Sequence, residues 1–260
     1  MKKQAIEIIY EDNDILVINK PSGISVTKDR SGQEELQDVL KSHKDLLLVH
    51  RLDKPTSGVM LLAKNTDAQR TYSRFFEERL VKKTYLTLVT GFARESQGVI
   101  DAPLAQSKHD HEKVTINHKI GKEAVTEWRL LADFELYALL AVCPKTGRTH
   151  QIRVHLPSIG LPLAIDQLYG SSKPIILSEF KRDYKFSTRH DEKPLIERLT
   201  LHAYQLEFSE PVTGKPSIFI AGLDKKFAAA IKMLTKYCNK GNTAFDDPDM
   251  LTKILAAQQI

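Results

Sequence analysis

Short apolar runs separated by charged turns mark the first third of the chain. Residues 6–10 and 15–19 are two such runs, and the acidic residues 11–14 between them are typical of a hairpin turn. Residues 59–63 are continuously apolar, which predicts a strand covered on both faces, and residues 84–89 alternate as a further strand.

Helical patterns fall between these strands and near the end of the chain. Residues 34–44 predict a short helix. The sequence Thr66-Asp67-Ala68-Gln69 is a capping-box pattern, which predicts a helix from Thr66 to about residue 79. Thr149 is a candidate cap for a helix over residues 150–156. Two more helices are predicted near residues 225–238 and 248–258.

The middle of the chain reads as several short strands over residues 97–135, interrupted by a polar loop at 107–113, and a buried strand at 136–143. Residues 171–198 are charged and irregular, which predicts an exposed insertion before a β region at 199–221. Because strands and helices do not alternate as regular βαβ units, the pattern favours an α+β fold.

Composition places the chain among ordinary globular proteins. It has 260 residues, 42% of them hydrophobic, and a formal net charge of +5, so disorder is excluded as the dominant state. The two cysteines are far apart in sequence, which argues against a disulfide scaffold. Early acidic residues exclude a secretory signal, and no apolar run approaches the ~20 residues that span a bilayer. We therefore expect a cytoplasmic protein without a membrane partner.

Positive charge gathers between residues 64 and 85. Taken alone, the run is typical of a solvated helix face, but it also suits a nucleic-acid-binding surface. Its basic members are Lys64, Arg70, Arg74, Arg79, Lys82 and Lys83, opposed by Asp67, Glu77 and Glu78.

The most informative segment for chemistry is His50-Arg51-Leu52-Asp53-Lys54-Pro55-Thr56-Ser57-Gly58, which leads into the apolar strand at residue 59. A carboxylate between two cations, on a loop beside a core strand, is a candidate reactive group. The alternative is an aspartate that accepts backbone hydrogen bonds in the turn. Local pattern alone leaves both open.

Four blocks in order give this chain a resemblance to the RluA/TruC-type RNA pseudouridine synthases. The segment from His50 to Gly58 resembles the motif that carries the catalytic aspartate of that family. The other blocks are Asn19-Lys20-Pro21-Ser22-Gly23, Lys83-Thr84-Tyr85 and the stretch from Lys145 to Leu156. Weaker matches occur at residues 166–170 and 201–203, and the resemblance covers about residues 6–223.

The resemblance implies a fold and a domain plan. The expected fold is α+β, with a central mixed, mostly antiparallel sheet, flanking helices and a cleft. The expected catalytic domain covers residues 1–223 in two sub-lobes without a separate N-terminal RNA-binding domain, followed by a helical extension over 224–260.

The resemblance also implies the reaction, in which a uridine within RNA is isomerised to pseudouridine with no metal and no cofactor. Asp53, Tyr85 and Arg153 are the catalytic residues that it implies, with Arg153 placed against Asp53. An always-charged guanidinium suits that pairing, and a tyrosine ring suits stacking on uracil. Asp53 could attack the base, attack C1′ or abstract a sugar proton, and the sequence leaves these alternatives open.

The target base must leave the helical stack to react. We expect Arg51 to fill the vacancy that the flipped nucleotide leaves. The remaining predicted substrate contacts are His50, Lys20 and Ile152 in the motifs and, for the phosphates, Lys82, Lys83, Arg74 and Arg148. Structured RNA is therefore the expected partner, tRNA being favoured over large-subunit rRNA because the chain begins near the first family strand, and no obligate protein partner is evident.

Alternative functions fit less well. A non-catalytic RNA-binding protein needs none of the three catalytic residues together, and a glycosidase needs a second carboxylate that is not evident. The histidines at 109, 111 and 118 lack the neighbours of a zinc site. Asp166 and Tyr169 read as turn residues and His202 as a satisfied core histidine. Two departures from the family pattern, Ile165 in place of the usual glycine and Glu210-Pro211 in place of His-Pro, lie outside the proposed centre.

Overall fold

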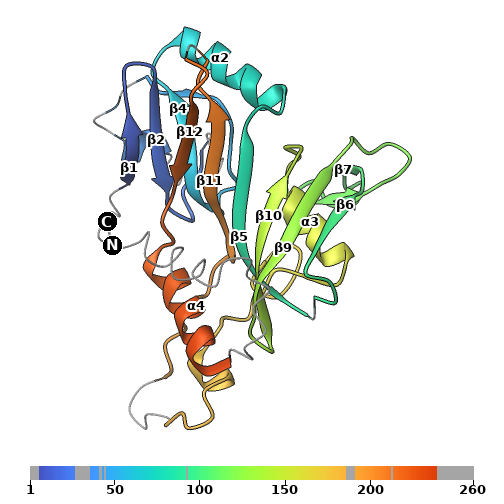
Figure 1. Ribbon diagram of the computed structural model, residues 1–260. Coiled ribbons are helices and arrows are strands. Elements are labelled where there is room, and N and C mark those ends of the chain that lie inside the picture. The colour runs from blue at the N-terminus through green and yellow to red at the C-terminus, as the bar shows by residue number, and fades with distance from the viewer. Residues whose placement is uncertain are drawn as a thin grey trace. The chain divides into compact units, whose positions relative to one another are not determined.

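The computed structural model describes residues 6–26, 36–40, 43, 45–91, 93–185, 191–211 and 213–238. The chain forms two compact units, each built from two segments (Figure 1). The first contains Met1–Tyr85 and His202–Gly222, and the second contains Leu86–Leu201 and Leu223–Ile260. The predicted catalytic domain of residues 1–223 spans both units, and the separate standing of residues 224–260 stays a prediction. The helix predicted at 248–258 lies outside the described residues.

The sheet of the first unit is mixed. Its strands are, in spatial order, β1 (Glu7–Glu11), β2 (Ile15–Lys20), β4 (Ser57–Ala63) and β11 (Leu201–Ser209). Strand β3 (Leu47–Leu48) pairs with β4, and β12 (Pro216–Ile220) pairs with β11. The predicted hairpin β1–β2 is confirmed, and β4 is buried along its whole length, as its apolar sequence predicts. The short β4–β11 contact is parallel, and β1–β2, β2–β4, β3–β4 and β11–β12 are antiparallel.

Two helices belong to this unit. The first, α1 (Leu36–Val39), ends before residue 40, short of the predicted end at 44, and residues 34 and 35 lie outside the described residues. The second, α2 (Thr66–Glu77), contacts β3 and β4 and buries Ala68 and Tyr72. The prediction that Thr66 caps this helix is wrong. Asn65 is the N-cap, because its backbone is extended and its side chain accepts a 2.8 Å hydrogen bond from the Ala68 amide.

The second unit is an antiparallel sheet with helices beside it. Strand β5 (Lys82–Thr90) begins in the first unit and continues into this one, where the spatial order is β5-β10-β9-β6. The other bounds are β6 (Gln97–Asp101), β9 (Val125–Asp133) and β10 (Tyr137–Pro144). A separate pair, β7 (Leu104–Gln106) and β8 (Val114–Ile116), flanks the predicted loop at 107–113.

Helix α3 (Gln151–Ser158) packs against β8, β9 and β10. The prediction that Thr149 caps this helix is wrong. The N-cap is His150, which has a left-handed backbone at φ 56° and makes no side-chain capping bond. Helix α4 (Lys225–Cys238) has the predicted bounds and buries an apolar face led by Phe227 and Leu234.

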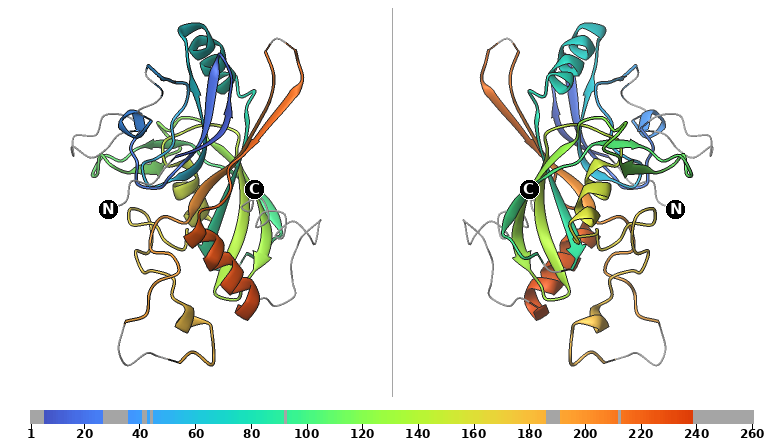
Figure 2. Two further views of the ribbon diagram at one scale, coloured as in Figure 1. Left: turned by 90° about the vertical axis from the view of Figure 1, so that its left-hand side faces the viewer. Right: turned by 90° about the vertical axis from the view of Figure 1, so that its right-hand side faces the viewer.

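The predicted insertion at 171–198 is irregular where it is described, apart from one 3₁₀ turn at Leu177–Glu179 (gold in Figure 2). It is not wholly exposed, because Ile175 and Ile196 form a bridge and are both buried. The mixed, mostly antiparallel strand pairing and the separate helices confirm the α+β class. None of the described helices has the length and apolar character needed to cross a membrane.

Candidate active site

The loop that carries Asp53 is tied to the loop that follows β2. Antiparallel pairing sets Lys20 opposite Gly58, which brings the two motifs together. The Gly23 amide donates to the Lys54 carbonyl at 2.8 Å, and the Ser22 hydroxyl donates to the Pro55 carbonyl at 2.6 Å. These bonds hold together two motifs that are distant in sequence.

Lys20 holds both loops from the inside. It is fully buried, and its Nζ donates to the carbonyls of Pro21 and Ile24 at 3.0 Å and of Lys54 at 3.2 Å. An ammonium group carries three donors, and these three carbonyls match that number. The structure thus favours a bracing role for Lys20 over the predicted contact with substrate.

The far end of the Asp53 loop is fixed by β11. Gly58 has φ +119°, and a Cβ there would lie 2.0 Å from the Ala203 carbonyl oxygen, so only glycine fits. The Ser57 hydroxyl lies 2.9 Å from Nδ1 of His202, whose Nε2 lies 3.0 Å from the Ala221 carbonyl. Since a carbonyl can only accept, Nε2 donates this bond. The reading of His202 as a satisfied core histidine is confirmed.

His50 opens the loop and faces the protein core. Its Nε2 accepts a 3.0 Å hydrogen bond from the Leu61 amide of β4, and its ring stacks on Phe76 of α2 at 4.2 Å. Burial, and then the nearby charge of Lys83, lower the pKa of His50 to about 3. The imidazole is therefore neutral at physiological pH, and its contacts favour a role in holding the loop over the predicted contact with substrate.

Asp53 and Tyr85 both belong to the first unit, and the charge of Asp53 acts on the Tyr85 phenol. The turn at Asp53 is closed by a 3.0 Å bond from the Thr56 amide to the main-chain oxygen of Asp53, and the side chain is partly exposed. Tyr85 packs against the apolar core of the unit. Burial, and then the negative charge of Asp53, raise the pKa of Tyr85 above its usual value near 10. The phenol is therefore a protonated donor beside a carboxylate.

The charged residues predicted to contact RNA lie in different settings. Arg51 is exposed beside Asp53. Arg74 pairs with Glu78 at 2.7 Å and Lys82 pairs with Glu207 at 3.2 Å, both as exposed surface pairs. Burial, and then Arg79, lower the pKa of Lys83 to about 8. All four lie in the first unit, and their contacts with RNA stay predictions.

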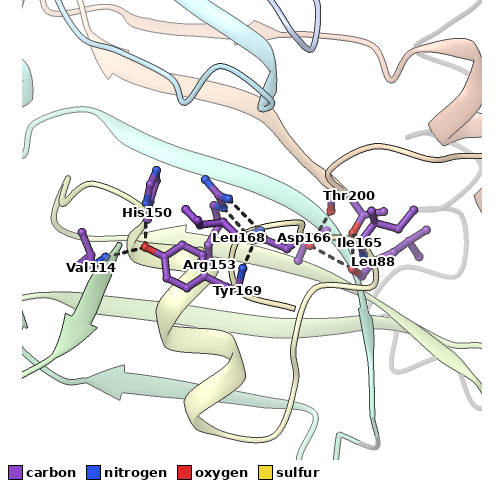
Figure 3. A network of polar contacts seen from close by, with 10 residues as sticks. Leu88, Val114, His150, Arg153, Ile165, Asp166, Leu168, Tyr169 and Thr200 are labelled. Carbon is purple, nitrogen blue, oxygen red and sulfur yellow. Dashed lines mark hydrogen bonds and ion pairs between the residues drawn. The ribbon is translucent and has the colours of Figure 1, made fainter. Parts of the chain in front are cut away.

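Three more predicted residues belong to the second unit. Arg148 donates from Nε to the Glu123 carbonyl at 2.9 Å, and Ile152 is buried in the core. Arg153 is 4% exposed, and its Nε and Nη2 donate to the two carboxylate oxygens of Asp166, each at 2.8 Å (Figure 3). Asp166 was expected to be a turn residue only. It also accepts the Leu168 and Tyr169 amides, so it is both a turn residue and a partner of Arg153.

The opposite face of α3 is fixed by a chain of neutral hydrogen bonds. The Gln151 amide donates to the Thr126 hydroxyl at 2.9 Å, which lies 2.8 Å from Nδ1 of His155. Nε2 of His155 donates to the Ala102 carbonyl at 2.8 Å. Burial lowers the pKa of His155, which keeps the imidazole neutral. Gln151 and His155, one turn apart, thus anchor the helix that carries Arg153.

Sequence reasoning missed these anchoring residues. Lys20 was predicted to contact the substrate, whereas buried lysines are rare. Gln151 and His155 were given no anchoring role, because their hydrogen-bond partners are tertiary neighbours. The signal available in the sequence was the position of these residues inside the motifs that resemble the family. Motif residues that do not react can still be needed to hold the residues that do.

Comparisons with known proteins identify the family. Residues 14–158 match the family model described as RNA pseudouridylate synthase. The chain is 38% identical to a ribosomal large subunit pseudouridine synthase C of Buchnera aphidicola, over 85% of this chain and 68% of the relative. It is 40% identical to an uncharacterized RNA pseudouridine synthase of Aquifex aeolicus, over 82% and 68%. The chain thus spans about two thirds of the length of these relatives.

Solved structures agree with this match. The human RNA pseudouridylate synthase domain containing 1 superposes with a TM-score of 0.70 at 25% identity, covering 99% of this chain and 97% of the human one. The human RNA pseudouridylate synthase domain containing 4 gives a TM-score of 0.65 at 28% identity, covering 88% and 92%. Since the matching family model spans more than half of the chain and contains the Asp53 loop, Tyr85 and Arg153, the chain belongs to the RNA pseudouridylate synthase family.

Proposed function

We propose that this chain isomerises uridine to pseudouridine in structured RNA, with Asp53 as the catalytic carboxylate. In that reaction the N1–C1′ bond breaks, the uracil turns, and a C5–C1′ bond forms. The proton on C5 is lost and N1 gains one, so the atoms balance without a redox partner. Asp53, Tyr85 and Arg153 are the residues assigned to these steps.

The observation that carries the proposal is the Asp53 carboxylate beside a protonated Tyr85 on a braced loop. The loop is fixed through Lys20, Ser22 and Gly23 at one end and through the β4–β11 contact at the other. Rigid placement of a reactive group supplies much of the rate enhancement when a reaction is governed by orientation. A loop with this many main-chain bonds suits such a group better than it suits a simple surface turn.

Tyr85 has two properties that suit this role. Its ring offers a flat apolar surface on which uracil can stack, and its raised pKa keeps the hydroxyl protonated. A hydroxyl donor near the carboxylate can assist the movement of the C5 proton. Arg153 is assigned as the counter-charge of Asp53 on the strength of the family resemblance.

Access to the base requires that the nucleotide leave the stack, at a cost of a few kcal/mol. The exposed guanidinium of Arg51, two residues before Asp53, is suited to occupy the vacated position. Arg51→Ala should therefore reduce turnover on a structured RNA more than on a minimal loop of the same sequence. Equal losses on the two RNAs, measured as kcat/KM, would remove Arg51 from this role.

Structured RNA is the proposed substrate class. The similar protein of Buchnera aphidicola is named for the large ribosomal subunit, which supports an rRNA substrate. The tRNA preference from the sequence has no such support, so both RNAs belong in the assay.

The decisive experiment uses the full chain with total tRNA and with rRNA, followed by mapping of pseudouridine. The wild type should form pseudouridine at defined positions, and Asp53→Asn should form none, because the amide has the same shape but no nucleophilic or basic carboxylate. Asp67→Asn, an exposed substitution on α2, is the control and should keep full activity. RNA binding without pseudouridine in the wild type would indicate the non-catalytic alternative, and activity in Asp53→Asn would refute the assignment.

A further inference from the structure

The Arg153 guanidinium is held on an edge and on a face by residues of its own unit (Figure 3). Asp166 takes the edge through the two 2.8 Å bonds from Nε and Nη2. Tyr169 takes the face, because Cζ of Arg153 lies 5.2 Å from the centroid of its ring. A planar cation fixed in both ways has one orientation, a property that lysine could not provide.

Asp166 is itself fixed by the backbone. Its Oδ1 accepts hydrogen bonds from the amides of Leu168 at 2.9 Å and Tyr169 at 3.2 Å, and its own carbonyl accepts the Gly170 amide at 2.8 Å. The side chain is nearly inaccessible to solvent. The turn therefore sets the direction of the carboxylate, and the carboxylate sets the plane of the guanidinium.

Tyr169 is fixed through its hydroxyl. The oxygen accepts a 2.7 Å bond from the Val114 amide of β8 and lies 2.8 Å from Nδ1 of His150, the residue that precedes α3 (Figure 3). His150 has the left-handed backbone that residues other than glycine rarely adopt, and this contact helps to hold it there. The ring is thus tied to a strand and to the start of the helix that carries Arg153.

We propose that Asp166 and Tyr169 are positioning residues for Arg153, an inference that rests on the proposed function of this site. Asp166 binds the Nε and Nη2 donors of the guanidinium, and the ring of Tyr169 covers its face. A buried ion pair is weak evidence for stability, because well-packed apolar residues stabilise a fold as well or better. The position of this ion pair beside the ring of Tyr169 points instead to a role in orienting the Arg153 guanidinium.

The test separates orientation from folding by four variants. Tyr169→Phe keeps the ring and loses both hydroxyl contacts, Tyr169→Leu loses the ring as well, and Asp166→Asn loses the ionic edge. Tyr137→Phe is the matched control, since its hydroxyl also donates to a side chain of this unit, Glu179 at 3.1 Å. The readouts are the single-turnover rate, the Kd for RNA, the melting temperature and the ¹⁵N–¹H signal of Arg153 Nε.

We expect Tyr169→Phe and Asp166→Asn to lower the single-turnover rate by roughly 10- to 100-fold with little change in Kd, as small misplacements of a catalytic group do. In an Arg153→Lys background, which lacks the fork, the same substitutions should cost less than about a further 2-fold. The Nε signal, assigned by its loss in Arg153→Lys, should broaden in Tyr169→Leu and Asp166→Asn and stay sharp in Tyr137→Phe.

Three results would overturn the proposal. They are unchanged single-turnover rates in the variants, equal losses of rate in the wild-type and Arg153→Lys backgrounds, or an Nε signal that changes in neither Asp166→Asn nor Tyr169→Leu. If Asp166→Asn fails to fold, Tyr169→Phe decides the kinetic outcome. A wild-type protein that forms no pseudouridine would contradict the proposed function, while the Nε signal would still decide whether these residues orient Arg153.

Discussion

At the scale of single residues, several side chains in the motifs serve the backbone of the reactive loop. Lys20 gives its ammonium to three carbonyls, and His50 accepts an amide of the neighbouring strand. Neither has to touch the substrate to be needed. The proposed chemistry is thus confined to few groups, and the neighbouring motif residues keep those groups in place.

The neutral His50 should make the protein sensitive to acid. The pKa of His50 is about 3 in the folded protein, against an ordinary value of 6.5 for the unfolded chain. Between these two values the unfolded chain therefore binds a proton that the folded chain does not. Stability from this group is therefore complete above pH 6.5 and falls as pH drops toward 3, by about 1.4 kcal/mol per pH unit. His50→Gln, whose amide oxygen can accept the Leu61 amide, should flatten the fall in melting temperature between pH 6.5 and 5.

The control for this titration is Phe76→Leu, which removes the ring stacked on His50 without removing the titrating group. It should lower the melting temperature and keep the acid slope of the wild type. An unchanged slope in His50→Gln would show that other groups cause the acid response.

Gly58 and Gly23 form a second matched pair, since both have positive φ but only Gly58 faces a neighbouring main chain. Gly23→Ala should lower the free energy of unfolding by about 1–2 kcal/mol, which is the cost of a left-handed alanine. Gly58→Ala should cost about 1–3 kcal/mol more, because its Cβ would overlap the Ala203 carbonyl. Urea denaturation measures both, and equal losses would mean that β11 moves aside.

At the scale of elements, strands were more predictable than helix starts. The bounds of β4 and α4 follow from local apolar patterns, which need no distant partner. The start of α2 depends on whether Asn65 or Thr66 supplies the cap, and both types suit the position. The start of α3 could not be predicted, because His150 is held by Tyr169, nineteen residues later in the sequence.

The α2 cap gives a direct test. Asn65→Ala should destabilise the protein by about 1 kcal/mol, because the Ala68 amide loses its partner. Thr66→Ala, the change that the capping-box reading would single out, should alter stability by less than about 0.5 kcal/mol. Thermal unfolding of the two variants distinguishes the caps, and the reverse order would restore Thr66.

At the scale of the whole molecule, the motifs predicted the family and the fold class, and their assignment of residues to the candidate site stays a prediction. The motifs did not predict how these residues are supported. The Arg153–Asp166 pair joins two motifs that sequence reasoning had assigned separate duties, catalysis and turn formation. A sequence motif indicates which residues belong to a site, whereas tertiary packing determines which carboxylate pairs with a given cation.

The electrostatics of RNA binding also belong to this scale. If Arg74 and Lys82 contact phosphates, each alanine substitution should reduce the slope of log K against log salt by about 0.7–0.9. Lys226 is an exposed lysine of α4 that pairs with Glu197. Lys226→Ala should therefore leave the slope unchanged. Filter binding from 50 to 300 mM salt measures this slope, since that is roughly the range over which such slopes are resolved. A slope that Arg74→Ala and Lys82→Ala leave intact would place the phosphates elsewhere.

Each unit takes strands or helices from both halves of the gene: the first is completed only by His202–Gly222, and the second only by residues after Leu223. On the ribosome, β4 emerges long before β11, so the Asp53 loop is synthesised well before its partner strand exists. A chain that stops near residue 200 would therefore contain neither unit intact, and two fragments divided between β4 and β11 would not fold independently.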